Sequence, residues 1–390
     1  IQRPHIARPR VKGLPAELFT ADTEEFFNTP GMDIIVEVVG GEKPALEYMQ
    51  RALAADKHVV TANKEVIAKH GVALHKLAQE HNVSLRYEGS VGGGIPLIAP
   101  FKYDLVANDL KGIYAIINGT TNYILTRMAK EGIDFNVALK SAQELGYAEA
   151  NPANDIEGID AKYKLAILAS LGFQTQVKPE DVYNEGISRL GSRDFRYAQE
   201  LGFAIKLLAI AKQANNAVEA RVHPVFIPAD SFLAKVDGVY NAILVEGDLV
   251  GKVLFFGEGA GASPTSSAVI ADIVSSAQDI QLGVADKARL KFDSGKKIKL
   301  MADIATRFYL RINVTDRPGV LAQIAKIFGD TGISIASVIQ KETNVVSQTA
   351  EVVIMTYPAR ERAMQKALEE LGKLPIMKEI SNFVRVEDIS

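Results

Sequence analysis

The run Asp33-Ile-Ile-Val-Glu-Val-Val-Gly-Gly41 is rich in β-branched residues and ends in two glycines, which is typical of a buried strand followed by a tight turn. A helix is predicted over 44–56, because its first residue is a proline and proline suits the first turn of a helix. A second strand is predicted at 58–62, and Asn63 is a good N-cap for a helix that extends to about Glu80. Strands and helices that alternate through short loops predict a doubly wound parallel sheet.

The carboxyl ends of these strands place glycines and charged residues at one edge of the sheet. A further strand at 83–88 is followed by the glycine-rich run 89–96. Ligands of open parallel sheets bind beyond the carboxyl ends of the strands. Those ends are Gly40-Gly41, Thr61–Lys64 and Glu88–Ser90. We therefore expect a ligand crevice with glycine turns, a lysine and a glutamate, within a first domain over 1–96.

The second predicted domain, 97–300, has a different pattern. Long helices are predicted over 161–171 and 197–214, and two strand-like runs are hairpin-spaced about the turn Glu246–Asp248. We expect an α+β arrangement in which helices cover an antiparallel sheet. The predicted strands are Lys111–Ile117, Ala220–Ile227, Gly238–Val245 and Leu249–Phe256.

A glycine-rich loop at 257–264 leads into a predicted helix over 265–277, which we expect to pack back on the first domain. The loop is also compatible with a plain flexible connector. Residues 285–306 are charged and lysine-rich, and we interpret them as a linker.

The third predicted domain, 307–390, reads as strand, helix, strand, strand, helix and strand, which is the ferredoxin-like βαββαβ order. The turn Asp316-Arg-Pro-Gly319 precedes its first helix, where free backbone N–H groups could hold a small carboxylate. A packing or dimerisation domain without a ligand is the alternative. The predicted elements are Phe308–Val314, Val320–Asp330, Ile333–Gln340, Val346–Thr356, Ala359–Leu371 and Ile376–Val386.

Lys164 is misplaced for an ordinary amphipathic helix. At about 100° per residue, Asp160 and the apolar Ile167, Leu168 and Leu171 fall on its face, while Lys162 points to the opposite side. A charged amine within an apolar stripe is costly unless it is paired or used. The segment is therefore either a structural Asp–Lys pair at the edge of a core or a site of chemistry.

The overall composition excludes several classes of function. A net charge of −3 over 390 residues gives no electrostatic case for binding nucleic acid or an anionic membrane. The absence of cysteine excludes disulfides and thiolate chemistry, which fits a cytoplasmic protein. No apolar run approaches the roughly 20 residues of a membrane span, and the N-terminus has no signal-peptide pattern.

Six motifs follow one another between residues 37 and 275 in an order that resembles the homoserine dehydrogenase family. The C-terminal part, 307–390, resembles an ACT domain, an amino-acid-sensing module found in many members. The resemblance implies a Rossmann-type nucleotide-binding domain ahead of the substrate domain. The motifs are Glu37-Val-Val-Gly-Gly41, Val59-Val-Thr-Ala-Asn-Lys64, Glu88-Gly-Ser-Val-Gly-Gly-Gly-Ile-Pro96, Asn118-Gly-Thr-Thr-Asn122, Gly146–Lys164 and Gly257-Glu-Gly-Ala-Gly-Ala-Ser-Pro-Thr265.

The chain departs from the family at its start. The family opens with a strand and a Gly-x-Gly-x-x-Gly turn that holds the cofactor pyrophosphate, and no such turn occurs near Ile1. We therefore expect a Rossmann-type sheet that is incomplete at its N-terminus, by truncation or disorder. A catalytically silent amino-acid-binding regulatory protein is the alternative function that this departure favours.

The resemblance implies NAD- or NADP-dependent interconversion of L-homoserine and L-aspartate 4-semialdehyde, in threonine, methionine and isoleucine biosynthesis. Lys64 and Lys164 match the family's two essential lysines, either of which is a candidate for moving the alcohol proton. Glu149 and Asp160 match its substrate-binding acids. Thr120 and Asp155 are further candidates for contact with the substrate.

The resemblance also implies the remaining contacts. A monovalent cation, Na⁺ or K⁺, would be bound by the Glu88 carboxylate and by the main-chain carbonyls of Val91, Gly93 and Ile95. Arg8, Arg10 and Lys12 would favour the 2′-phosphate of NADP, although a solvated basic strand end is an equal reading. Threonine is the expected effector, and a homo-oligomer, dimer or tetramer, is expected. The expected cofactor contacts are Gly40, Gly41, Thr61, Asn63, Lys64, Gly259 and Gly261, and the effector contacts are Asp316, Pro318, Gly319 and Val320.

Overall fold

The computed structural model describes residues 15, 18–284, 290, 292, 295–344 and 348–389. The chain forms two compact units. Unit 1 comprises Ile1–Tyr87 and Val269–Lys287, and unit 2 comprises Glu88–Ala268 and Ala288–Ser390. The basic cluster Arg8, Arg10 and Lys12 lies outside the described residues, as does much of the predicted linker.

Unit 1 contains the predicted parallel sheet. Its strands β1 (Ile34–Glu37), β2 (His58–Thr61) and β3 (Leu85–Arg86) lie in the order β1-β2-β3. Asn63 caps the long helix as predicted, because its side-chain oxygen accepts the N–H of Val66 at 3.1 Å. The helices are α1 (Thr23–Phe27), α2 (Ala45–Ala54), α3 (Lys64–Glu80) and the part of α9 (Ala262–Leu282) that starts at Val269.

Unit 2 is built on one large sheet with strand order β12-β13-β11-β15-β7-β6-β4-β8-β9. Its central strands pair antiparallel, as predicted. They are β4 (Leu110–Ile116), β6 (Phe203–Ala214), β7 (Ala217–Pro228), β8 (Tyr240–Gly247) and β9 (Gly251–Glu258), and the short β5 (Tyr183–Asn184) and β10 (Lys297–Ile298) pair with β7 in parallel.

The predicted helix over 197–214 is wrong. Only α8 (Ser192–Glu200) is helical, and residues 203–214 form strand β6. The run Phe203–Ala214 is rich in alanine, leucine and lysine, which favour helices in isolation. It pairs with β7 along its whole length and is buried on both faces over 205–211. A central strand position therefore overrides the local preference.

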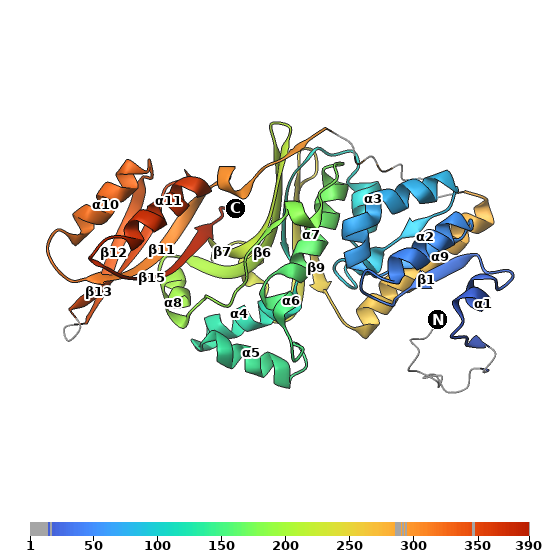
Figure 1. Cartoon of the computed structure of the whole chain (residues 1–390), viewed down its shortest axis with the longest axis horizontal. Coiled ribbons are helices and arrows are strands. Elements are labelled where there is room, and N and C mark those ends of the chain that lie inside the picture. The colour runs from blue at the N-terminus through green and yellow to red at the C-terminus, as the bar shows by residue number, and fades with distance from the viewer. Residues whose placement is uncertain are drawn as a thin grey trace. The chain divides into compact units, whose positions relative to one another are not determined.

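Helices pack against this sheet and carry the polar motifs of the middle region. α7 contacts β6, β7 and β4, and α4 contacts β6 and β8 (Figure 1). The helices are α4 (Gly119–Glu131), α5 (Phe135–Glu144), α6 (Ala153–Ile156) and α7 (Ile159–Gly172), with shorter turns η2 (Glu88–Ser90), η3 (Pro100–Asp104), η4 (Pro179–Asp181), η5 (Leu233–Lys235) and η6 (Met301–Asp303).

The C-terminal part has the predicted βαββαβ order. Its core is formed by residues such as Phe308, Phe328 and Leu371, which are fully buried. The elements are β11 (Ala305–Thr315), α10 (Val320–Asp330), β12 (Ile335–Asn344), β13 (Thr349–Thr356), β14 (Ala359–Arg360), α11 (Glu361–Gly372) and β15 (Met377–Val386).

The C-terminal sheet is not separate from the middle one. β15 pairs in parallel with β7, where Arg385 lies opposite Val225 and Val386 opposite Phe226. Buried charges secure this junction: Arg221 is fully buried and donates hydrogen bonds to Glu219 and Glu387. The sequence predicts separate middle and C-terminal domains. The structure instead joins their strands in one shared sheet within unit 2.

His223 lies in the same junction and is fully buried. Its Nε2 accepts the Nε–H of Arg221 at 3.2 Å, and its Nδ1 donates to the carbonyl of Pro224 at 2.8 Å. Burial lowers the pKa of this imidazole well below its usual value, and the charges of Arg385 and Arg221 lower it further. The ring is therefore held neutral in the folded protein.

We predict that His223 makes the fold sensitive to mild acid. The unfolded histidine takes up a proton near its ordinary pKa of about 6.5, whereas the buried one does not, so stability is lost as pH falls below that value. Urea midpoints between pH 8 and pH 5 should fall less steeply in His223→Gln than in the wild type. Lys140→Gln, at a side chain that is 78% exposed, is the control and should keep the wild-type slope, because a lysine does not titrate in this range. Equal slopes in all three proteins would contradict the prediction.

Candidate functional site

A buried lysine and aspartate stand at the start of α7. Lys164 Nζ donates to Asp160 Oδ2 at 2.8 Å and to the carbonyl of Ile117 at 2.9 Å. The two residues are only 8% and 5% exposed. The spacing of four residues predicted this pair, and the second bond joins the amine to the end of β4. Because the amine is paired on two sides, its position is fixed.

The apolar surroundings of Lys164 are wider than the predicted stripe. Ala161, Leu165 and Ala166 are buried as well as Ile167 and Leu168. α7 is enclosed because it packs between the large sheet and η3. Lys162 faces the other way, as predicted, and donates to Asn184 Oδ1 at 3.2 Å.

Asn118 joins the two predicted aspartates. Its Nδ2 donates to Asp155 Oδ1 at 2.7 Å and to Asp160 Oδ2 at 2.9 Å. Its Oδ1 caps α4 by accepting the N–H of Thr121 at 2.9 Å. In the sequence, Asn118 is recognisable only as part of the Asn118–Asn122 motif and is not among the predicted site residues. Its signal was an asparagine at a helix start, which alone indicates a cap.

The other predicted substrate residues, Thr120 and Glu149, lie in the first turn of α4 and in the loop after α5. The hydroxyl of Thr120 donates to the carbonyl of Tyr147 at 2.6 Å, which ties the start of α4 to the loop after α5. Glu149 is exposed two residues further along that loop. The ring of Tyr147 lies 5.0 Å from that of Tyr123. Thr120 therefore fixes a loop that presents the Glu149 carboxylate to solvent.

Unit 1 carries a second polar group at the carboxyl edge of its sheet. Glu37 is 3% exposed, and its carboxylate accepts the N–H groups of Val39 and Gly40 at 2.7 and 3.3 Å. It also accepts the hydroxyl of Thr61 at 2.6 Å. Asn63 Nδ2 donates to the carbonyl of Gly41 at 2.8 Å. The sequence pattern alone indicates no role for Glu37, although Glu37 is the last residue of β1.

The two glycines after β1 fit the close approach of a nucleotide. Gly40 and Gly41 have φ values of +76° and +72°, which side chains rarely adopt. A Cβ added to either would meet no atom within 4 Å. Lys64 starts α3 beside this turn. The edge formed by 37–41 and 61–64 is thus open at its two glycines, which leaves room for the close approach that a dinucleotide needs.

Gly259 has a packing role that the sequence did not show. A Cβ there would lie 1.7 Å from Asn241 Nδ2, and a Cβ on Gly93 would lie 2.6 Å from the carbonyl carbon of Gly259. The two glycine-rich loops 92–94 and 257–261 therefore pack directly on each other. Gly261, with φ of +128°, ends the second loop. Contact of this loop with a cofactor stays a prediction.

The carboxylate of Glu88 is used within the protein. Its oxygens accept the N–H groups of Leu97, Ile98 and Ala99 at the start of a helical turn. Any cation beside this segment would therefore be bound mainly by main-chain carbonyl oxygens. The buried Oδ1 of Asn241, close to the loop that packs on Gly93, has no hydrogen-bond partner among the described residues. It is a further oxygen with unused binding capacity.

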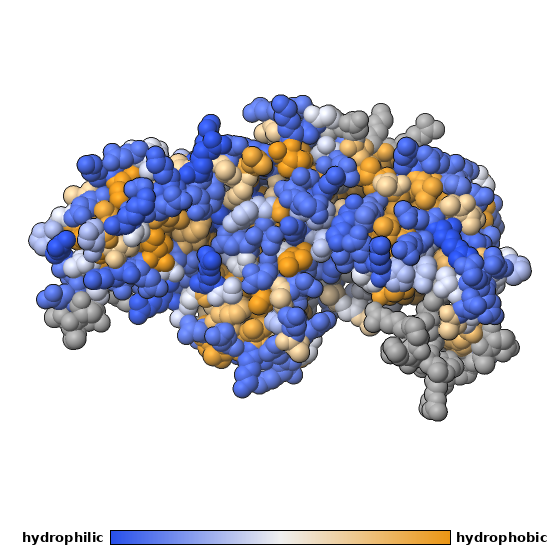
Figure 2. Space-filling model, viewed as in Figure 1, coloured by the Kyte–Doolittle hydropathy of each residue, from blue (hydrophilic) through white to orange (hydrophobic). Residues whose placement is uncertain are grey.

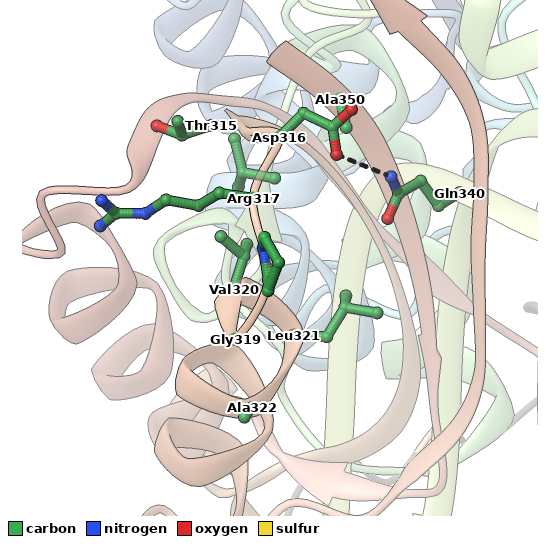
Figure 3. A pocket seen from close by; sticks show the side chains of 11 residues that line it. Thr315, Asp316, Arg317, Gly319, Val320, Leu321, Ala322, Gln340 and Ala350 are labelled. Carbon is green, nitrogen blue, oxygen red and sulfur yellow. Dashed lines mark hydrogen bonds between the residues drawn. The ribbon is translucent and has the colours of Figure 1, made fainter. Parts of the chain in front are cut away.

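The C-terminal part contains a cavity of about 270 Å³ at the start of α10 (Figure 3). Gln340 of β12 faces Asp316 across it, with Nε2 and Oδ1 3.5 Å apart, whereas the side chain of Arg317 points away from both. Gly319 precedes α10 with φ of +87°. All four predicted effector residues line the cavity, namely Asp316, Pro318, Gly319 and Val320.

Within the described residues, no group of three or more histidine, aspartate or glutamate side chains is placed to hold a metal ion. None of their helices combines the length and the apolar character that crossing a membrane would need.

Three protein-family profiles match the chain. They are described as homoserine dehydrogenase over residues 96–274, homoserine dehydrogenase NAD binding domain over 2–88, and ACT domain over 308–376. The ACT match falls on the part with the βαββαβ order and the cavity.

Relatives extend the match over nearly the whole chain. A homoserine dehydrogenase of Synechocystis sp. is 44% identical over 388 residues, which is 97% of this chain and 89% of that protein. The Bacillus subtilis homoserine dehydrogenase is 36% identical over 382 residues, 98% and 88% of the two chains.

Solved structures agree. A homoserine dehydrogenase from Thiobacillus denitrificans superimposes with a TM-score of 0.86 at 42% identity, covering 92% of this chain and 83% of that one. A hyperthermophilic archaeal homoserine dehydrogenase in complex with NADPH gives a TM-score of 0.56 at 31% identity, over 63% of this chain and 72% of that one.

Proposed function

The chain belongs to the homoserine dehydrogenase family, and on that premise we propose that it interconverts L-homoserine and L-aspartate 4-semialdehyde with NAD or NADP. The observation that carries the proposal is the buried Asp160–Lys164 pair, linked through Asn118 to Asp155. A purely structural pair would not need a second acid held beside it by an amide. The reaction belongs to the synthesis of threonine, methionine and isoleucine.

The acidic residues of unit 2 bind the substrate ammonium group and orient the Lys164 amine. Homoserine carries an ammonium group, which the exposed Glu149 carboxylate and the Asp155 carboxylate are suited to accept. Asp160 holds the Lys164 amine at 2.8 Å, so its role is to orient the lysine rather than to bind the ammonium. Thr120 positions the loop that carries Glu149 through its bond to Tyr147.

Lysine moves the proton of the substrate hydroxyl. Lys164 Nζ is fixed by two acceptors, which leaves its remaining N–H direction for the substrate oxygen. Lys64, at the first turn of α3, is the second candidate for the same proton. A nicotinamide cofactor supplies the chemistry that the side chains lack, the acceptance or donation of hydride at the substrate carbon.

The carboxyl edge of the unit 1 sheet would hold that cofactor. The open glycines 40 and 41 and the Thr61–Lys64 turn fit it, and the match to a NAD binding domain supports this role. Gly259 and Gly261 are proposed as further contacts. The NADPH complex of the archaeal relative supports a nicotinamide cofactor without deciding between NAD and NADP.

A monovalent cation, Na⁺ or K⁺, is proposed at the carbonyls of Glu88, Val91, Gly93 and Ile95. The Oδ1 of Asn241, on β8 beside the loop 257–261, has no hydrogen-bond partner among the described residues and supports an oxygen-rich site there. Its role would be to stiffen the glycine-rich segment.

The enzyme should form homo-oligomers, a dimer or a tetramer. Strand β9 is the outer strand of the large sheet, and its residues Leu254 and Phe256 are 39% and 56% exposed. Apolar surface also gathers over α4 and α5, where Val137 and Leu145 are exposed (Figure 2). Exposed apolar faces of this kind are typical of association surfaces.

We predict that Lys164→Ala lowers kcat for homoserine-dependent reduction of NAD⁺ or NADP⁺ by about 10²- to 10⁴-fold, the usual contribution of a positioned acid–base group. The control is Lys140→Ala, whose side chain is 78% exposed on α5, and it should retain wild-type rates. Circular dichroism checks that both variants fold.

If the wild-type protein folds but reduces neither NAD⁺ nor NADP⁺ in the presence of homoserine, the proposed dehydrogenase activity is contradicted. It would leave a catalytically silent amino-acid-binding protein as the function. An active Lys164→Ala variant would instead remove Lys164 from the chemistry.

Threonine is the proposed feedback effector, bound in the cavity at the start of α10. The cavity offers the carboxylate of Asp316 to an ammonium group and the backbone at the N-terminus of α10 to a carboxylate. The amide of Gln340 is suited to a hydroxyl group, which threonine carries.

We predict that L-threonine inhibits the wild-type enzyme and that Gln340→Ala raises the threonine concentration for half inhibition about tenfold, because one hydrogen bond is lost. Lys341→Ala is the matched control, since this neighbour on β12 bonds Glu200 instead. Threonine titration of the activity measures both. No inhibition of the wild type, or equal inhibition of all three proteins, would contradict the effector site.

A further inference from the structure

The junction of β15 with β7 is connected by hydrogen bonds to the segment 183–187. Arg385 of β15 is 1% exposed, and its Nη1 donates to Glu185 Oε2 at 2.7 Å. The hydroxyl of Tyr183 donates to the same oxygen at 3.0 Å. The rest of the guanidinium is bound by Glu361, at the start of α11. The C-terminal part thus holds the segment 183–187 through a buried arginine.

The segment 183–187 is pinned to β7 as well. Asn184 lies opposite Val222 in a parallel pairing, and the N–H of Glu185 donates to the carbonyl of Val222 at 2.8 Å. Glu185 therefore stands where three parts of unit 2 meet: β7, β15 and the segment that precedes α8.

The same segment fixes the connection between α6 and α7. Asn184 Nδ2 donates to the carbonyl of Glu157 at 2.9 Å, and the N–H of Ile187 donates to the carbonyl of Ile156 at 2.9 Å. A Cβ on Gly186 would lie 2.5 Å from the carbonyl oxygen of Ile156, so the two backbones are in direct contact. This connection joins Asp155 on α6 to Asp160 on α7.

We propose that Glu185 and Asn184 are positioning residues through which the C-terminal part sets the spacing of Asp155 and Asp160. The chain of contacts is Arg385 to Glu185, Asn184 to Glu157, and from there to the two aspartates that Asn118 bridges. It runs through the folded junction and does not need the lysine-rich residues 285–306. The inference rests on the proposed function and adds the route by which an effector-sensing domain reaches the substrate acids.

The chemistry of the contacts predicts which kinetic constants change. Asp155 is assigned to the substrate ammonium and Asp160 to orienting Lys164, whereas none of the proposed nucleotide contacts lies in 156–158 or 183–187. A shift of the 156–158 connection should therefore change KM and kcat for homoserine and leave KM for the nucleotide unchanged. A general loss of folded protein would lower kcat alone, without such a split.

Two near-isosteric variants and one control test the proposal. Asn184→Asp keeps the acceptor for Lys162 and loses the donor to Glu157, and Glu185→Gln weakens the bond to Arg385. Lys212→Gln removes another ion pair across the same junction, that of Lys212 with Glu387, without touching 183–187. Homoserine and nucleotide kinetics are measured on the complete enzyme, with thermal midpoints recorded for all proteins.

Both test variants should lower kcat/KM for homoserine roughly three- to tenfold, the value of one hydrogen bond, with nucleotide KM unchanged. Their double variant should lose less than the product of the single effects, because both act on one route. Lys212→Gln should match the wild type. If the wild type is active and Glu185→Gln and Asn184→Asp behave like Lys212→Gln, the positioning role is overturned; an inactive wild type would instead refute the proposed function.

Discussion

The site depends on one buried ion pair, Lys164 with Asp160. An amine and a carboxylate removed from water are stable only while each keeps its partners, and breaking such a pair leaves an uncompensated charge that costs about 3–5 kcal/mol. Here the pair is completed by the carbonyl of Ile117 and the amide of Asn118. The start of α7, the end of β4 and the cap of α4 are therefore held in one arrangement.

This constraint explains why several parts of unit 2 converge on the same turn. Asn118 can cap α4 and bridge two acids only if α4, α6 and α7 keep their spacing. The segment 183–187 supports that spacing from the other side, and Arg385 supports the segment. The substrate acids and the C-terminal sheet are thus parts of one packed body, which gives a sensing domain a physical means of influence.

Local patterns in the sequence predict the features that neighbouring residues determine, such as helix faces, helix caps and turns. The four-residue spacing of Asp160 and Lys164 placed them on one helix face, and Asn63 marked the start of α3. The βαββαβ order and the glycine turn after β1 were also evident. The alanines and lysines of residues 203–214 favour a helix, and only the pairing with β7 makes this segment a strand.

The features that the sequence does not predict depend on contacts between residues that are far apart in the chain. The bridge from Asn118 to Asp155 and Asp160 spans 37 and 42 residues, and the contact of Arg385 with Glu185 spans 200. Nothing in the local pattern of Glu37 shows that its carboxylate meets Thr61. The sequence also does not indicate that β15 and β7 belong to one sheet, because each has the pattern of a strand in its own separate domain.

The most direct test of the central claim is a crystal structure of the protein with L-homoserine bound beside a nicotinamide cofactor. The account predicts the substrate ammonium within hydrogen-bond distance of the Asp155 or Glu149 carboxylate, and the hydroxyl within that distance of Lys164 Nζ. Homoserine bound away from these groups, with Lys164 still contacting only Asp160 and Ile117, would contradict it.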